Sequence, residues 1–355
     1  MKIPKMFFKI SLAVFLWIAA GPTSAKDKPD ITILATGGTI AGAASSAVQS
    51  GYTSGQVTID AMVNAVPEAL KLANIQGEQI SNVGSQDMSF EIMLKLAKRI
   101  NELAAGGKVD GIVITHGTDT MEETAYFLNL VSKADIPVVL VGAMRPSTAV
   151  SADGPLNLYN AIAVAADPNA KGRGVLLVMN DSIHSAQTLT KISTTAVQTF
   201  VSPIRGQIGV TSYGKNDFYR YPDQRFGKKS EFSADGLTQV PRVDIVYADV
   251  DMPADLIDAS VERGAKGIVV AGVGNGNMNK AALEASARAS KKGVVVVRST
   301  RVATGLVGRN VEVNDDELGL VASYNLNPQK SRILLSMALL KTKNLKDIQR
   351  IFEQY

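Results

Sequence analysis

Short apolar runs alternate with amphipathic stretches along the chain from Asp30 onward. The amphipathic stretches place apolar residues on one helical face, and they cover residues 91–103, 121–131 and 280–290. The apolar runs are typical of strands buried on both faces, and they cover residues 31–35, 111–115, 137–142, 174–179, 243–248, 267–271 and 294–298. This alternation predicts an α/β fold with a mostly parallel sheet.

One stretch interrupts the alternation. Residues 214–241 are polar, rich in charge and punctuated by Gly and Pro, without a clean period. Such a stretch is typical of a connection between domains, although a long excursion within one domain has the same appearance. A chain of 355 residues favours two domains over one. We therefore expect a larger N-terminal α/β domain over 26–219, a linker over 220–241, and a smaller C-terminal α/β domain with a parallel sheet over 242–355.

The first 25 residues have the pattern of a secretory signal peptide. Lysines precede an apolar run over 10–20, and small residues that suit cleavage follow at 23–25. The run is shorter than a membrane span requires, and a retained N-terminal anchor is the alternative interpretation. We expect residues 1–25 to be cleaved on export to the periplasm or the medium, which leaves no attachment to the membrane.

Removing that segment changes the charge of the chain. The whole sequence has 37 Lys+Arg and 33 Asp+Glu, and residues 1–25 hold three lysines and no acidic residue, so the mature chain has 34 basic against 33 acidic residues. A nearly neutral protein gives no argument for a nucleic-acid or membrane partner. The chain has no Cys and two His, which argues against disulfides, a thiol nucleophile or a metal cluster. Export without disulfides points to a bacterial exterior.

Polar residues follow the predicted strand at 111–115. Thr120 with Glu123 predicts a capping box for a helix that begins near residue 121. Thr118 and Asp119 are therefore expected at a strand's carboxyl end, beside a helix N-terminus, which is where open α/β sheets bind ligands. We expect His116 to be a structural hydrogen-bonding residue, with a general base as the alternative, because it has no nucleophile-elbow context.

A second polar cluster, TGGTIAG at 36–42, follows the first predicted strand. Paired glycines allow a sharp turn that brings N–H groups close to a ligand, but the spacing fits neither a dinucleotide fingerprint nor a P-loop. If the two strands are neighbours, Thr39, Thr118 and Asp119 converge on one crevice. A threonine nucleophile needs a base, and Lys191 is a candidate, although from the residues alone a solvated surface lysine is the simpler interpretation.

Two further turns are candidates for contact with a ligand. One contains Ser85 and Gln86 and follows a short strand-like run, and the other, over 272–277, follows the strand predicted at 267–271 and contains Asn275 and Asn277 among three glycines. Gly, Asn and Ser form turns for purely local reasons. Their position at strand ends favours contact with a ligand.

Together these segments resemble the bacterial-type L-asparaginase family, specifically its secreted type II branch, which includes glutaminase-asparaginases. The resemblance covers essentially the whole mature chain, and it rests on ITILATGGTIAG at 31–42, GIVITHGTDTMEETAYFL at 111–128, VGAMRPSTAVSADGPLNLYNA at 141–161, AGVGNGN at 271–277 and LNPQKSRILL at 326–335. It implies hydrolysis of the side-chain amide of L-asparagine through a threonyl acyl-enzyme, with possible secondary L-glutaminase activity. It also implies a homotetramer that requires no metal or organic cofactor.

The resemblance assigns roles to single residues. Thr39 matches the nucleophile, and Tyr52 matches a mobile-loop tyrosine that closes over the substrate and assists Thr39. Thr118, Asp119 and Lys191 match a second constellation, in which Thr118 positions or activates the attacking species and Lys191 tunes it.

Other positions match the substrate-binding residues of that family. Ser85 and Gln86 match residues that hold the α-carboxylate, and Asp119 with Thr118 matches the binding site of the α-ammonium. Asn277 and Glu312 match residues that a neighbouring subunit contributes.

Two other functions fit parts of the sequence. A periplasmic amino-acid-binding protein is also exported, α/β and two-domain, but it has no need of Thr39, Thr118 and Lys191 together. The asparaginase-like subunit of a tRNA-dependent amidotransferase does not fit an exported chain.

Overall fold

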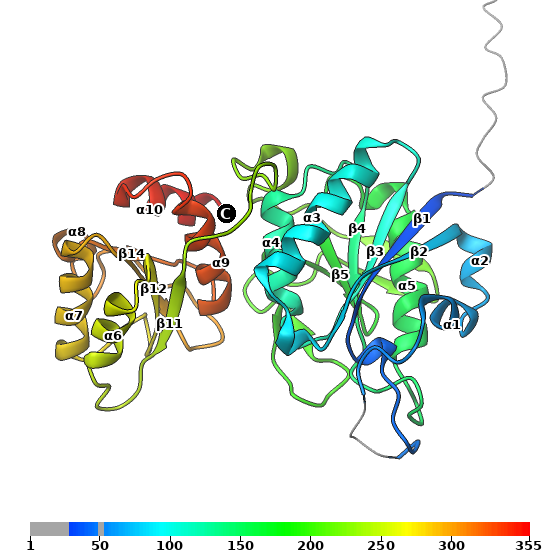
Figure 1. Cartoon of the computed structure of the whole chain (residues 1–355), viewed down its shortest axis with the longest axis horizontal. Coiled ribbons are helices and arrows are strands. Elements are labelled where there is room, and N and C mark those ends of the chain that lie inside the picture. Colours follow the sequence, from blue (N-terminus) through cyan, green and yellow to red (C-terminus); the bar gives the residue numbers. More distant parts are fainter. Residues whose placement is uncertain (1–27, 49–52) are drawn as a thin grey trace, which may run out of the picture.

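A computed structural model of the protein describes residues 28–48 and 53–355 (Figure 1). The predicted signal peptide and Tyr52 lie outside the described residues. Two domains are visible in Figure 1, one around a large sheet and one around a small sheet, with the chain crossing between them before β11. No helix in the described part of the chain is long and apolar enough to cross a membrane.

The large sheet has the strand order β10-β9-β6-β5-β4-β3-β1-β2. Its strands β2, β1, β3, β4 and β5 run parallel, and β6, β9 and β10 complete the sheet in antiparallel fashion. The strands span Asp30–Gly37 (β1), Asn74–Val83 (β2), Gly111–Thr115 (β3), Val138–Val141 (β4), Val175–Met179 (β5), Ser182–Ser185 (β6), Gly209–Ser212 (β9) and Lys215–Phe218 (β10). The mostly parallel sheet of the sequence prediction is confirmed. Residues 215–218, which lack a clean pattern, belong to this sheet and not to a connection.

Helices cover both faces of the large sheet because each offers one apolar face. Side chains of α5 and α1 share one apolar core with the sheet, and side chains of α3 and α4 share another on the opposite face. The elements of this domain outside the large sheet are α1 (Ile59–Asn64), α2 (Ala69–Leu72), α3 (Phe90–Ala105), α4 (Met121–Val131), α5 (Gly154–Ala166), the short helices η1 (Thr39–Ala41), η2 (Ser85–Asp87), η3 (Pro168–Ala170) and η4 (Gly227–Lys229), and the strand pair β7 (Thr190–Lys191) and β8 (Phe200–Val201).

The small sheet is entirely parallel, in the order β11-β12-β13-β14. Its elements are β11 (Val243–Tyr247), α6 (Asp255–Glu262), β12 (Gly267–Gly272), α7 (Lys280–Lys291), β13 (Val295–Thr300), α8 (Asp315–Leu318), β14 (Leu320–Ala322), α9 (Pro328–Ala338) and α10 (Leu345–Gln354). Side chains of α6 and α7 pack on one face. Those of α9 and α10 pack on the other, in the core that also contains α3 and α4. An apolar core therefore continues from one domain into the other, with α9 against α4.

The parallel arrangement brings several turns to one edge of the large sheet. Since β2, β1, β3 and β4 run in the same direction, the turns after them lie at the same edge. The chain leaves β1 through helices on one face and leaves β2 through α3 on the other. The order β2-β1-β3 is therefore a topological switch point, where open α/β sheets bind ligands.

Candidate active site

The turn after β1 and the turn after β3 touch through two glycines. A Cβ on Gly38 would lie 2.3 Å from the backbone nitrogen of Gly117, so a side chain is impossible there without movement of the backbone. Gly38 also has a φ of 84°, which favours glycine. The hydroxyl of Thr36 donates to the carbonyl of Thr115 across the same pair of strands, at 2.9 Å. Thr39 and Thr118 each follow this contact by one residue and are both 5% exposed.

Ser85 belongs to a third turn, the one after β2, and joins the same cluster. Its side chain is buried, and its Oγ accepts a hydrogen bond from the backbone N–H of Asp119 at 3.0 Å. A Cβ on Gly117 would lie 2.6 Å from that Oγ, so this turn also requires the glycine. Gln86, the next residue, is exposed.

The predicted capping box at the start of α4 is wrong. The helix begins at Met121 with Thr120 as its N-cap, but the Thr120 side chain makes no capping hydrogen bond. Its hydroxyl donates instead to the carbonyl of Ser85 at 2.6 Å, and Glu123 pairs with Arg332 at 3.6 Å. The Thr120 hydroxyl, which the local pattern assigned to the helix cap, therefore makes a hydrogen bond to a distant part of the chain instead.

Lys191 reaches this cluster from β7. Its Nζ donates to Thr118 Oγ1 at 2.9 Å and to Asp119 Oδ1 at 2.7 Å. The Lys191 side chain is 16% exposed, unlike a solvated surface lysine, while that of Asp119 is 61% exposed. The Thr118 hydroxyl donates in turn to Met144 Sδ at 3.4 Å, and sulfur is a weak acceptor. As an ammonium, Lys191 holds the Thr118 oxygen, and only its neutral amine could take the hydroxyl proton.

His116 is a structural residue here, as expected. It is fully buried, its Nδ1 donates to the carbonyl of Gly117 at 2.6 Å, and its Nε2 accepts from the hydroxyl of Thr124 at 2.9 Å. Burial lowers the pKa of His116 to about 4, so the ring is neutral at pH 7. Both ring nitrogens are occupied, and His116 holds the turn that precedes Thr118.

Asn277 and Glu312 lie in the C-terminal domain, where the Asn277 amide donates to the Glu312 carboxylate. Their loops are held by the buried Arg298, which donates to the carbonyls of Asn275 and Gly308. The described hydrogen bonds join Asn277 and Glu312 to each other and not to the threonine cluster.

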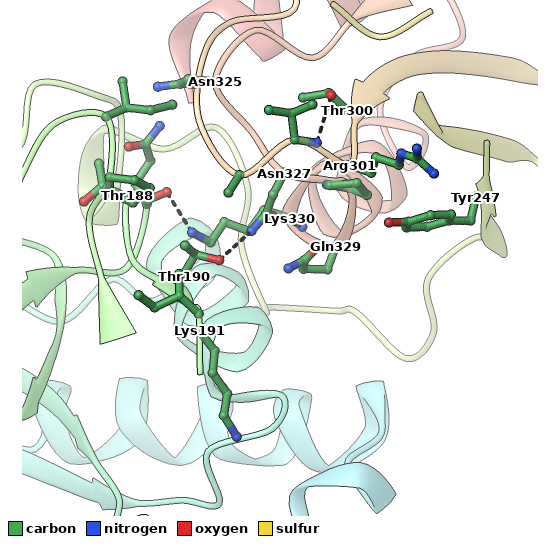
Figure 2. Close-up of a pocket in the computed structure, with 17 residues that line it drawn as sticks. Thr188, Thr190, Lys191, Tyr247, Thr300, Arg301, Asn325, Asn327, Gln329 and Lys330 are labelled. Atoms are coloured by element: carbon green, nitrogen blue, oxygen red, sulfur yellow. Dashed lines mark hydrogen bonds between the residues drawn. The ribbon is translucent and has the colours of Figure 1, made fainter. Parts of the chain in front are cut away.

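A pocket of about 320 Å³ lies behind the strand that carries Lys191, between the two domains (Figure 2). Thr190, Asn327, Gln329 and Lys330 line it, and the Lys191 side chain points away from these residues. The sequence does not predict this polar cluster, because its members occupy ordinary positions of a helix and a loop. No group of three or more potential metal ligands occurs within residues 28–48 and 53–355.

Comparisons with known proteins match both domains. The family model described as "Asparaginase, N-terminal" matches residues 30–225, and "Glutaminase/Asparaginase C-terminal domain" matches residues 242–352. The chain is 52% identical to "Probable L-asparaginase periplasmic" of Haemophilus influenzae, over 98% of this chain and 99% of that protein. It is 50% identical to "L-asparaginase 2" of Escherichia coli, over 99% and 100%, and 45% identical to "Glutaminase-asparaginase" of Pseudomonas fluorescens biotype A, over 92% and 90%.

A solved structure matches the whole architecture. The probable cytoplasmic L-asparaginase of Campylobacter jejuni superposes with a TM-score of 0.90 at 47% identity, covering 92% of this chain and all of that one.

Proposed function

Because the chain belongs to the asparaginase family, we propose that it hydrolyses the side-chain amide of L-asparagine to L-aspartate and ammonia, with secondary action on L-glutamine. The names of the relatives support both substrates and disfavour an amino-acid-binding protein without catalysis. The observation that carries the proposal is the contact of Lys191 with Thr118, on a turn that touches the turn of Thr39.

In the proposed mechanism, Thr39 Oγ1 attacks the amide carbon of the substrate. A C–O bond forms, the C–N bond breaks, and the threonine's proton leaves with ammonia, which yields an acyl ester on Thr39. Water then attacks the ester, the C–O bond to Thr39 breaks, and a proton returns to the threonine. Backbone N–H groups of the glycine-containing turns are suited to stabilise the oxyanion of each step. Tyr52 assists Thr39, and Lys191 tunes Thr118.

The polar groups around the threonines suit a zwitterionic amino acid. We assign the α-ammonium to the largely exposed carboxylate of Asp119, with Thr118 beside it, and the α-carboxylate to Ser85 and Gln86. The hydrogen bond from Asp119 N–H to Ser85 Oγ holds these two binding groups side by side. Such paired charge-assisted contacts give both affinity and orientation.

The working form that we propose is a homotetramer. Asn277 and Glu312 then enter the site of a neighbouring subunit, which is consistent with their bonding to each other rather than to this chain's threonine cluster. We also propose export to the periplasm with cleavage of residues 1–25. One relative is named periplasmic, and the solved structure is named cytoplasmic.

The proposal is tested by removing one hydroxyl at a time. Thr39→Ala and Thr118→Ala should each lower ammonia release from L-asparagine by about 10³-fold or more, with an unchanged fold. The matched control is Thr36→Val, which removes a hydroxyl in the same motif whose hydrogen bond goes to a backbone carbonyl. This control should lose about 1 kcal/mol of stability and keep its turnover within a few-fold. Near-normal turnover by either alanine variant would refute the two-threonine mechanism.

A further inference from the structure

A cluster of buried charges joins the two domains next to the strand that carries Lys191, on the side away from the Lys191 side chain (Figure 2). Glu122, in the first turn of α4, is 4% exposed, and Lys330, in the first turn of α9, is 3% exposed. Their charged atoms lie 3.7 Å apart. Two opposite charges withdrawn from water in this way add little stability on balance, because the loss of hydration offsets their attraction. The pair therefore suggests a role other than stabilising the fold.

The ammonium of Lys330 is bound to the chain segment that leads to Lys191. It donates to the carbonyl of Gln187 at 3.1 Å and to the carbonyl of Leu189. The hydroxyl of Thr190, the residue directly before Lys191, donates to Glu122 Oε1 at 3.4 Å. Three contacts, at residues 187, 189 and 190, therefore fix the segment that leads to Lys191.

The C-terminal domain supplies the other partners of Glu122. Asn327 Nδ2 donates to Glu122 Oε2 at 2.8 Å, and Gln329 Nε2 donates to Glu122 Oε1 at 2.9 Å. Asn327 also donates to Thr190 Oγ1 at 3.3 Å, and it forms the N-cap of α9. Each carboxylate oxygen of Glu122 thus accepts from the C-terminal domain, and the start of α9 is held against the start of α4.

We propose that Lys330 and Glu122 are positioning residues for Lys191, through which the packing of the C-terminal domain sets the contact between Lys191 and Thr118. The proposal rests on the function proposed above for Lys191. The described hydrogen bonds of these two residues do not reach Thr39, Thr118 or Ser85. Lys330 holds the backbone just before β7, and Glu122 holds Lys330 and Thr190. The side chain of Lys191 points away from this support (Figure 2) and donates to Thr118.

The first test is Lys330→Met, which keeps an unbranched chain and removes the ammonium. Loss of this support should displace Lys191 from Thr118 and lower kcat by about 10- to 100-fold, since misplacement by about 1 Å has effects of that size. KM should change less than kcat, because Ser85 and Gln86 make no described contact with Lys191, whereas Asp119 loses one hydrogen bond.

The matched control is Arg332→Met, also on α9. Arg332 pairs with Glu123 of α4 and donates to the carbonyl of Val243, so it too joins the domains, but away from Lys191. This variant should keep the wild-type kcat. An unchanged kcat in Lys330→Met, or an equal loss in Arg332→Met, would overturn the proposal.

A second variant separates positioning from folding. Lys330→Met alone leaves the buried carboxylate of Glu122 without a cation, which destabilises the fold, and Glu122→Gln in the same chain removes that uncompensated charge. The double variant should therefore regain thermal stability while its kcat stays low. If kcat returns together with stability, Lys330 has only a structural role.

Lys191→Met distinguishes the role proposed for Lys191 from the positioning role proposed for Lys330. Low turnover in Lys191→Met with normal turnover in Lys330→Met refutes the positioning proposal alone. Normal turnover in Lys191→Met refutes the role proposed for Lys191, and the positioning proposal falls with it.

Discussion

Replacing Gly38 by Ala tests whether the close approach of the two glycine turns sets the threonine pair. Gly38 has φ 84° and ψ −174°, a region used almost only by glycine, where another residue costs about 1–3 kcal/mol. The added Cβ would lie 2.3 Å from the Gly117 nitrogen, whereas ordinary contacts begin at 3.4 Å. The two turns must therefore separate by about 1 Å, and misplacement by about 1 Å lowers kcat by about 100-fold.

Gly107→Ala is the matched control for this experiment. Gly107 also has a positive φ, of 64°, but a Cβ there would meet nothing within 4 Å. It should lose about 1 kcal/mol of stability from backbone strain and keep the wild-type kcat. The assays are steady-state ammonia release from L-asparagine and unfolding in urea. If Gly38→Ala turns over as fast as Gly107→Ala, the glycine contact does not position the threonines.

Two further predictions concern buried ionisable groups. Burial lowers the pKa of His116 and of His184 to about 4 each, below their ordinary value of 6.5. The unfolded chain therefore takes up protons first, and stability present above pH 6.5 is lost as the pH falls toward 4, by roughly 3 kcal/mol per histidine. The free energy of unfolding of His116→Gln in urea should therefore depend less on pH than that of the wild type. An equal dependence on pH would contradict this. Arg298→Met should destabilise the protein by about 3–5 kcal/mol, because it leaves the buried Asp315 carboxylate, which pairs with Arg298 at 2.6 Å, without a cation. Adding Asp315→Leu should restore most of the loss in urea unfolding, and no recovery would show that the pair is not the cause.

Much of the fold is predictable from the sequence because the buried strands have a strong apolar pattern. Residues 111–115 and 121–131 form β3 and α4 with the predicted bounds, and the other strands and helices predicted from pattern differ by a residue or two at their ends. The edge strand β2 (Asn74–Val83) alternates weakly and has a single buried position, so the apolar pattern indicates only its end. Strand β10 has the same weakness.

The site is predictable to the extent that it follows strand ends. Thr39, Ser85 and Thr118 could be grouped because parallel strands bring their carboxyl ends to one edge. The role of Thr120 could not be foreseen, since its hydroxyl is taken by the carbonyl of Ser85, which local sequence does not indicate. The burial of Glu122 could not be predicted from the sequence either, because a charged residue in the first turn of a helix is ordinarily solvated.

The most direct test of the central claim is the covalent intermediate itself. Mixing the mature protein with excess L-asparagine and quenching rapidly in acid should trap an aspartyl ester, which peptide mapping by mass spectrometry should locate on Thr39. The ester should be absent from Thr39→Ala under the same conditions. An ester found on Thr118, or ammonia release at the normal rate by a chain that cannot be acylated at Thr39, would contradict the account.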